Sequence, residues 1–461
     1  MAADSVWRRL FAAVQGVRNA WRSAVQRLLE RLAWNRAYRI VSYLRSALWG
    51  VPLVAALLEL VVFRVLRAVD HYVTWDLTGL QAAGAQTLFQ TVITLTLSFI
   101  IFTFGSLLVA VQIAGGQLTP RIIATTLLRD RVLKYTVGLN VFTMLFVISA
   151  VNRLAGEVSQ LVTFLAILLG LACLGAFLFL IDYAARLLRP VRIVALVCDD
   201  GLEVIRTVYP VKGADSPADG DDGRAEALGA PARTVLHEGT SQVVLAVDTA
   251  TLVAEARRVG GVIEFVPQVG DFVAADEPLF RLYGGAAGID DKVLREAAAF
   301  GPERTLEQDP MFAFRILVDI AIKALSPAIN DPTTAVCAID QIHRLLRYVG
   351  LRRLHGEFIC DRDGAVRVIL RTPNWQDFVH ISCNEIRACG ANSVQIVRRQ
   401  RAMLENLVRS LPSERHDALL QELDNLDRVL PDYYKLPADL ALARIPDSQG
   451  LGGAAAGLRR G

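Results

Sequence analysis

Long apolar runs are confined to the first two fifths of this chain and alternate there with short polar segments. A helix needs about 20 largely apolar residues to cross a bilayer, because each residue adds only about 1.5 Å along the helix axis. Four stretches meet or approach that length: Leu48 to Leu66, Leu88 to Ile113, Tyr135 to Val151 and Gln160 to Leu188. The pattern predicts a four-helix transmembrane domain over residues 48–190.

Arginine placement around these stretches predicts the orientation of the chain. Nine arginines precede the first stretch, against only Asp4 and Glu30. Basic residues also lie between stretches two and three and after stretch four, whereas the other two loops are poor in them. Because basic loops stay on the cytoplasmic side, we expect both termini in the cytoplasm. The first apolar run begins only near Leu48, so we expect an anchor rather than a cleavable signal peptide.

The N-terminal segment, residues 1–47, is predicted to be a basic amphipathic helix on the cytoplasmic face. From Val6 to Leu32, apolar residues recur at helical spacing and arginines occupy the remaining surface. Such a helix suits an anionic lipid surface, so the bilayer is a predicted partner. The alternative is a helix that packs on the cytoplasmic domain.

Two polar features lie within the predicted spans. Glu59 is near the middle of the first, where an unpaired charge costs at least about 2.5 kcal/mol. It is either an ion or proton site, or a carboxyl kept protonated or hydrogen-bonded between helices. The second span carries a polar stripe at intervals of three, four and seven residues: Thr87, Thr91, Thr94, Ser98, Gly105 and Gln112. That stripe either lines a hydrated pathway or packs closely against another helix, and packing is favoured.

The remainder of the chain predicts a mixed α/β cytoplasmic domain. Residues 191–232 form a helix and then a flexible linker rich in Asp, Gly, Ala and Pro. Residues 233–285 are rich in valine and phenylalanine and form a small barrel-like β unit. Residues 286–440 are mainly helical, with a β-hairpin predicted around the Asp-Gly turn at 363–364. The tail, residues 441–461, is predicted to be disordered.

The sequence SPAINDP, residues 326–332, predicts a break between two helices. Asp331 suits the N-cap and Pro332 the first helical position, which explains both residues without a ligand. The alternative is that Ser326, Asn330 and Asp331 receive an anion at the helix N-terminus. Asp319 and Lys323, four residues apart, are predicted to form an ion pair on the preceding helix.

Composition narrows the function by exclusion. A content of 53% hydrophobic residues is too apolar for an ordinary soluble enzyme, and a net charge of +3 gives no reason to expect a nucleic-acid partner. The six cysteines and six histidines show no metal-ligand spacing. The stretch VGDFVAADEPLF resembles half of a lipoyl- or biotin-carrier domain, but no lysine lies between Lys212 and Lys292 to hold a cofactor. We expect no cofactor and no metal, and no catalytic motif supports an enzyme.

Three stretches resemble a family of bacterial predicted membrane proteins, domain of unknown function 2254. They are QLTPRIIATTLLRDRVLKYTVG, VVLAVDTATLVAEARRVGGVIEFVPQVGDFV and ERTLEQDPMFAFRILVDIAIKALSPAINDPTTAV. Family members carry Ser-Gln-Phe-Ser-Pro-Arg at the first stretch; here Gln117, Pro120 and Arg121 match, whereas Gly116 and Leu118 replace the first serine and the phenylalanine. The resemblance implies a bacterial inner-membrane location and supplies no catalytic residues. It also draws attention to the loop from Gly115 to Asp130.

Three functions are compatible with these patterns. The first is a channel or transporter with a regulatory cytoplasmic domain, suggested by Glu59, the polar stripe and the loop that contains Arg121. Four spans are few for a pore within one subunit, so this function predicts a homo-oligomer. The second is a membrane-anchored sensor or scaffold that binds a cytoplasmic ligand or protein. The third is an enzyme acting on lipid or envelope material.

Overall fold

The computed structural model describes residues 33–70, 79–119, 121, 130–152, 159–187, 189–213, 228–354 and 357–451. The amphipathic helix expected over Val6 to Leu32 lies outside these residues. The chain forms two compact units, each assembled from separate segments. One unit, here the α/β unit, contains Met1–Tyr43, Glu203–Phe312 and Val349–Phe378. The other, the helical unit, contains Leu44–Leu202, Ala313–Tyr348 and Val379–Gly461.

The helical unit begins with the apolar helices. They are α3 (Gly50–Asp70), α4 (Ala82–Gln117), α5 (Arg131–Val151) and α6 (Gln160–Leu187). By length and composition, three helices within the described residues can cross a membrane: α4, α5 and α6. The expected four-span domain is therefore found in part. A helix does form at the predicted first span, but α3 is not among the three, and it carries both Glu59 and Arg64 within its apolar stretch.

These four helices share one apolar core. Phe63 of α3 meets Phe146 of α5 edge-on, with ring centroids 5.7 Å apart, and Val51 packs against Gly138. Phe89 of α4 and Ala166 of α6 belong to the same cluster and are almost fully buried. The absence of a side chain at Gly138 permits this close approach, because a Cβ there would lie 2.8 Å from a Val51 methyl carbon.

The second part of the helical unit consists mainly of amphipathic helices. They are α10 (Pro310–Leu325), α11 (Pro332–Gly350), α12 (Trp375–Gly390), α13 (Val394–Ser410), α14 (His416–Tyr433) and α15 (Pro437–Ala443). Most of α7 (Pro190–Val208) also belongs to this unit, whereas most of α2 (Trp34–Ser46) belongs to the α/β unit. The predicted break at SPAINDP is confirmed, since α10 ends just before it and α11 begins within it. Residues 444–450 contact α13: Arg398 Nε donates to the Ile445 carbonyl at 2.9 Å. The prediction of a disordered tail over residues 441–461 did not include this contact.

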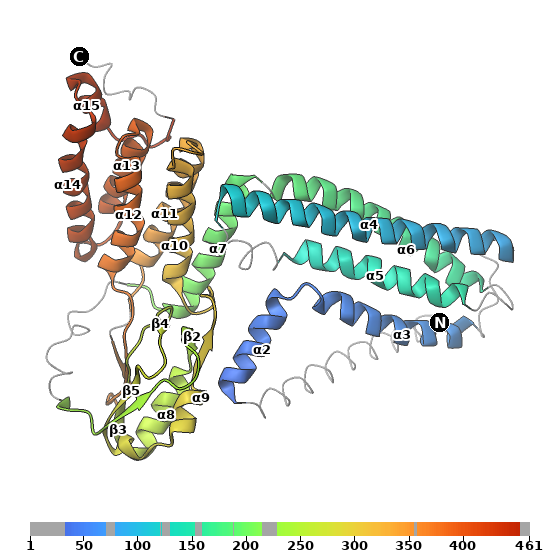
Figure 1. Ribbon diagram of the computed structural model, residues 1–461, viewed down its shortest axis with the longest axis horizontal. Coiled ribbons are helices and arrows are strands. Elements are labelled where there is room, and N and C mark those ends of the chain that lie inside the picture. The colour runs from blue at the N-terminus through green and yellow to red at the C-terminus, as the bar shows by residue number, and fades with distance from the viewer. Residues whose placement is uncertain are drawn as a thin grey trace. The chain divides into compact units, whose positions relative to one another are not determined.

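The α/β unit contains two sheets, and the expected barrel-like unit is not confirmed (Figure 1). A five-stranded sheet has the order β1-β5-β3-β8-β7, and a three-stranded sheet has the order β4-β2-β6. The strands are β1 (Arg233–Leu236), β2 (Gln242–Val247), β3 (Gly261–Phe265), β4 (Phe272–Val273), β5 (Pro278–Gly284), β6 (Ala298–Gly301), β7 (Phe358–Cys360) and β8 (Val366–Leu370). The predicted hairpin is confirmed as β7 and β8, which pair antiparallel.

The larger sheet joins distant parts of the sequence. β8 pairs parallel with β3, with Ile263 opposite Val368, so residues from both predicted segments 233–285 and 286–440 share one sheet. The linear division into six segments stays a prediction, but strand pairing ties two of them together. Helix α8 (Thr249–Val259) contacts β3 and β8, and α9 (Asp291–Glu296) precedes β6. Their apolar side chains fill one core that includes Leu252, Phe265 and Leu294, all fully buried.

Candidate functional site

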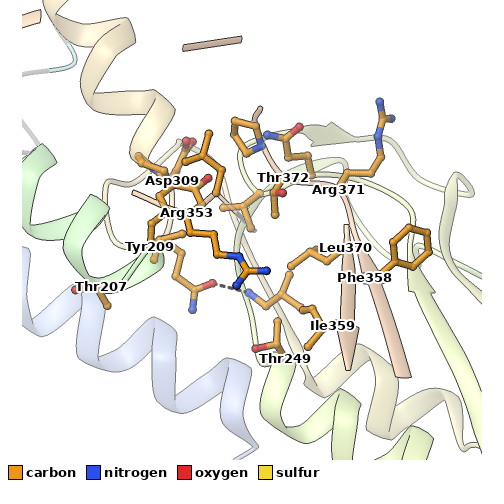
Figure 2. Close-up of a pocket in the computed structure, with 18 of the residues that line it drawn as sticks. Thr207, Tyr209, Thr249, Asp309, Arg353, Phe358, Ile359, Leu370, Arg371 and Thr372 are labelled. Atoms are coloured by element: carbon orange, nitrogen blue, oxygen red, sulfur yellow. Dashed lines mark hydrogen bonds between the residues drawn. The ribbon is translucent and has the colours of Figure 1, made fainter. Parts of the chain in front are cut away.

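A pocket with a volume of about 600 Å³ lies entirely within the α/β unit (Figure 2). It is formed where α7 ends, where β2 passes into α8, before α10, and along β7 and β8. Its lining residues include Thr207, Tyr209, Val247, Thr249, Gln268, Gln308, Asp309, Arg353, Leu354, Phe358, Ile359, Leu370, Arg371 and Thr372. The volume falls within the range of small-molecule sites, about 300 to 1,000 Å³.

Two helix N-termini lie beside this pocket, and each is closed by a carboxylate of the chain itself. Asp248 caps α8 and accepts from the Thr251 amide at 3.1 Å. Asp309 caps α10 and accepts from the Phe312 amide at 3.1 Å. Because these carboxylates already satisfy the free amides, the helix ends position the wall rather than offer an open anion site.

Asp309 is held by a short ion pair at the edge of the pocket. Its Oδ2 receives Arg304 Nε at 2.8 Å and Nη2 at 2.5 Å, and only 4% of its side chain is exposed. Burial raises the pKa of Asp309, while the Arg304 guanidinium and the amide hydrogen bonds lower it. Gly270 leaves room for the pair, because a Cβ there would lie 2.3 Å from Arg304 Nη2.

Gln308 is fixed in orientation within the pocket wall. Its Oε1 accepts from the Val247 amide at 3.0 Å, the contact drawn as a dashed line in Figure 2. An amide side chain whose oxygen is held in this way keeps both NH₂ donors for a ligand. Leu354 and Leu370 are buried with 4% and 9% of their surface exposed, so the same wall is apolar between its polar groups.

A second cluster, here the α4–α10 cluster, contains several residues singled out in the sequence. Arg121, just beyond α4, donates to Asp319 of α10 at 2.5 Å. Asp319 also pairs with Arg315 at 2.5 Å, and Arg315 makes a bidentate pair with Glu385 of α12. These hydrogen bonds hold the pKa of Glu385 below its usual range. Within the helical unit, the cluster ties the end of α4 to α10 and α12.

Lys323 completes this cluster and corrects one prediction. Asp319 pairs with the two arginines instead of with Lys323, whose Nζ donates to the Gly115 carbonyl at 2.8 Å. Ser326 Oγ donates to the Lys323 carbonyl at 2.7 Å. A hollow of about 390 Å³ lies against Arg315, Asp319, Lys323, Ser326 and Glu385. The carbonyl at the end of α4 attracts the lysine because its own helix no longer supplies a donor.

The SPAINDP turn has the capping geometry that was favoured over an anion site. Asp331 accepts from the Thr334 amide at 3.1 Å and from the Thr334 hydroxyl. Asn330 occupies the left-handed region, with φ of 47°, which asparagine tolerates better than most residues. The Asp331 carboxylate therefore occupies the helix end where an anion would bind.

The candidate residues on or beside the apolar helices differ in exposure and in hydrogen bonding. Glu59 is only 2% exposed, and its Oε1 has no hydrogen-bond partner among the described residues. Asn140 of α5, the helix that packs along α3, is 1% exposed, and its side-chain carbonyl oxygen likewise has no partner in the described part of the chain. Gln112 is exposed on α4, and the structure does not describe the Gln117 side chain. Asp130 caps α5, accepting from the Leu133 amide at 3.0 Å and from the Tyr183 hydroxyl.

The polar stripe of α4 is exposed and is not covered by other helices within the described residues. Thr91, Thr94 and Ser98 are exposed, and each hydroxyl donates to the carbonyl four residues earlier. These bonds satisfy the hydroxyls within their own helix, as happens on lipid-facing or subunit-facing surfaces. Within the described residues, no group of three or more His, Cys, Asp and Glu side chains is placed to hold a metal ion.

The pocket of the α/β unit was missed by sequence reasoning. Its lining comes from segments as far apart as Thr207 and Thr372, which strand pairing brings together. Of the α4–α10 cluster, Arg121, Asp319 and Ser326 were singled out, whereas Arg315 and Glu385 were not. The spacing of Arg315 and Asp319, four residues apart, was a usable signal for that pair.

Comparison with known proteins identifies the family. The profile described as "Predicted membrane protein (DUF2254)" matches residues 45–406, so the chain belongs to this family. An uncharacterised protein of Mycobacterium tuberculosis (strain H37Rv) and one of Mycobacterium bovis are each 26% identical to it over 385 residues. The match covers 77% of this chain and 71% of each relative. No solved structure matches the chain.

Proposed function

We propose that this member of the family is a membrane-anchored sensor whose α/β unit binds a small molecule. In this proposal the apolar helices hold the chain in the bacterial inner membrane, with both termini and the α/β unit in the cytoplasm. The observation that carries it is the pocket of about 600 Å³, lined by separate segments of one unit. A concave, mainly apolar site with a few fixed polar groups is the usual form of a ligand site.

Filling the pocket tests this function. Thr207 is exposed near the end of α7 and lines the pocket, so Thr207→Trp adds an indole without disturbing the core. The full chain in lipid nanodiscs is incubated with a bacterial cytosolic small-molecule extract, and native mass spectrometry records bound species. We expect the wild type to retain a ligand and to gain about 2.7 kcal/mol at a hundredfold excess over its Kd. The variant loses both.

The matched control is Arg206→Trp. Arg206 is the neighbouring exposed residue; it pairs with Glu203 at the surface and does not line the pocket. The Arg206→Trp variant should remain folded, because exposed ion pairs contribute little to stability. It should also retain the ligand, because the substituted residue does not line the pocket. Absence of any bound species in the wild type, or equal binding by Thr207→Trp, would remove the basis for the sensor.

A second candidate function is ion or proton conduction by an oligomer, and Glu59 favours it. A carboxyl that is 98% buried with an unpartnered oxygen is costly in an apolar helix bundle, and such residues mark ion pathways. We expect Glu59→Gln to reduce flux through reconstituted liposomes about tenfold or more, since it removes the ionisable group at nearly constant shape. Arg64→Gln, an exposed change on the same helix, is the control. Undetectable wild-type flux under any potential or pH eliminates this candidate.

A further inference from the structure

Three neutral side chains in the wall of the α/β pocket have hydrogen-bonding groups that no described residue uses. They are Gln308 before α10, Gln268 between β3 and β4, and Thr249 at the start of α8. The NH₂ group of Gln308 has no acceptor among the described residues, and the side chains of Gln268 and Thr249 have no described partner. Because all three line the same hollow, these groups are available to a ligand.

The charged residues of the lining are not available in the same way. Asp309 is held by Arg304, which lies outside the lining. Arg353 is engaged within the chain. Figure 2 shows Arg371 at the rim, pointing away from the hollow. Amide and hydroxyl groups therefore supply the unused hydrogen bonds on this wall.

The two glutamines are held in different ways and offer different groups. The side-chain oxygen of Gln308 accepts from the Val247 amide at 3.0 Å, so its unused groups are two N–H donors. Gln268 is fixed through its backbone, because its amide donates to the Asp271 carboxylate at 2.8 Å and its carbonyl accepts from the Asp271 amide at 3.0 Å. Its side-chain oxygen is left as an acceptor. One glutamine thus supplies an oriented donor and the other an acceptor.

The rest of the wall is apolar and determines the body of the ligand. Val247 and Leu370 are at most 9% exposed, and Val269 and Ile359 pack against the core of the α/β unit. A small polar molecule would leave this surface uncovered, and a purely apolar one would leave the glutamines without partners. A ring with one polar edge would satisfy both parts of the wall.

We propose that the pocket takes an uncharged ligand with a planar amide edge, in which Gln308 donates to the ligand carbonyl and Gln268 accepts from the adjacent N–H. Cyclic amides and nucleobases carry such edges, and an amide side chain pairs with them through its own donor and acceptor groups. This inference rests on the proposed sensor function and adds the chemical class of the ligand. Gln308 is the specificity residue, because its bond to Val247 fixes which of its groups remains for the ligand.

Three soluble, neutral probes test the ligand class. Para-fluorobenzamide has the carbonyl and the N–H, N,N-dimethyl-para-fluorobenzamide has only the carbonyl, and para-fluoroaniline has only the N–H. Each is titrated into the full chain in lipid nanodiscs and followed by fluorine NMR line broadening, with empty nanodiscs subtracted. We expect para-fluorobenzamide to bind saturably and at least about tenfold more tightly than either of the others, since only it satisfies both glutamines.

The variant Gln308→Glu assigns the effect to one residue. It keeps an oxygen to accept from the Val247 amide and replaces the NH₂ donors with a second acceptor. It should weaken para-fluorobenzamide binding about tenfold or more without weakening para-fluoroaniline, whose N–H can donate to the new oxygen. Loss of the fold would weaken every probe alike.

Gln268→Glu is the matched control. It places the same charge in the same pocket but keeps an acceptor for the ligand N–H and leaves the Gln308 donors in place. It should keep the preference for para-fluorobenzamide over its N,N-dimethyl derivative. All three probes should be displaced in Thr207→Trp.

The outcomes separate this inference from the function on which it rests. If the three probes bind equally and Gln308→Glu changes none of them, while Thr207→Trp still blocks binding, the amide class is overturned and the sensor survives. If none of the probes binds, the amide class is again overturned, and retention of an extract ligand decides the sensor separately. If binding persists unchanged in Thr207→Trp, the pocket is not the site and both proposals fall.

Discussion

Replacing Arg304 with methionine is expected to lower the free energy of unfolding of the α/β unit by about 3 kcal/mol at neutral pH. The change leaves Asp309, with 4% of its side chain exposed, as a buried carboxylate without its cation. Breaking a buried pair in this way costs about 3 to 5 kcal/mol. The lower end applies because 35% of the Arg304 side chain is exposed and the Phe312 amide still donates to Asp309.

The loss should depend on pH in a defined direction. Burial already raises the pKa of Asp309, and removal of Arg304 takes away the main group that lowers it. A carboxyl whose pKa is higher in the folded state contributes stability that is present below its unfolded pKa and is lost as pH rises through the folded pKa. The difference between wild type and variant should therefore shrink as pH falls from neutral towards the ordinary pKa of an aspartate, because protonation removes the uncompensated charge.

Hydrogen exchange of β3 and β5 amides in the full chain measures this difference. A loss of about 3 kcal/mol corresponds to exchange faster by about a hundredfold. Adding Asp309→Asn to Arg304→Met should recover part of the loss, because the uncompensated charge disappears. Arg258→Met, which breaks only a surface pair, should stay within about 0.5 kcal/mol of wild type. A loss independent of pH and of Asp309→Asn would contradict the buried-pair interpretation.

Gly261→Ala is expected to destabilise the α/β unit by more than about 3 kcal/mol. A Cβ at Gly261 would lie 2.1 Å from the Ala286 amide nitrogen and 2.7 Å from the Tyr283 carbonyl oxygen. Both neighbours are backbone atoms, so the clash cannot be relieved by turning a side chain, and overpacking of this kind exceeds the usual cost of about 1 to 3 kcal/mol. Strand β3 would have to move away from β5, to which it is hydrogen-bonded.

Gly288→Ala is the matched control for this change. Gly288 lies in the short 3-10 helix that follows β5, and a Cβ at this position would have no described heavy atom within 4 Å. Its substitution should change stability by no more than about 0.5 kcal/mol. Denaturant unfolding with exchange of β3 and β5 peptides compares the two. Equal stability of the two variants would show that the close backbone approach at Gly261 does not require glycine.

Several local features could be predicted because short-range chemistry determines them. Asp331 and Pro332 begin α11 through capping and a fixed φ, whatever surrounds them. The hairpin of β7 and β8 follows from the Asp-Gly turn between two β-rich runs. Arg121 and Asp319 were singled out separately, and only the structure brings them together as an ion pair; the ion pair predicted between Asp319 and Lys323 was wrong. A basic side chain pairs with whichever acceptor the folded chain brings near it. Sequence spacing within one helix does not show which other helices lie beside it.

The sequence by itself determined that this chain carries membrane-spanning helices and a mixed α/β region, because apolar length and residue periodicity are local properties. Only the tertiary structure showed that three helices within the described residues can cross a membrane and that the strands form two sheets; the predicted barrel-like unit is not confirmed. It also decided that Thr207, Gln308 and Arg353 line one pocket. The reason is that strand pairing between β3 and β8 joins residues about a hundred positions apart. The periodicity within one segment predicts a strand but does not show with which other strand it pairs.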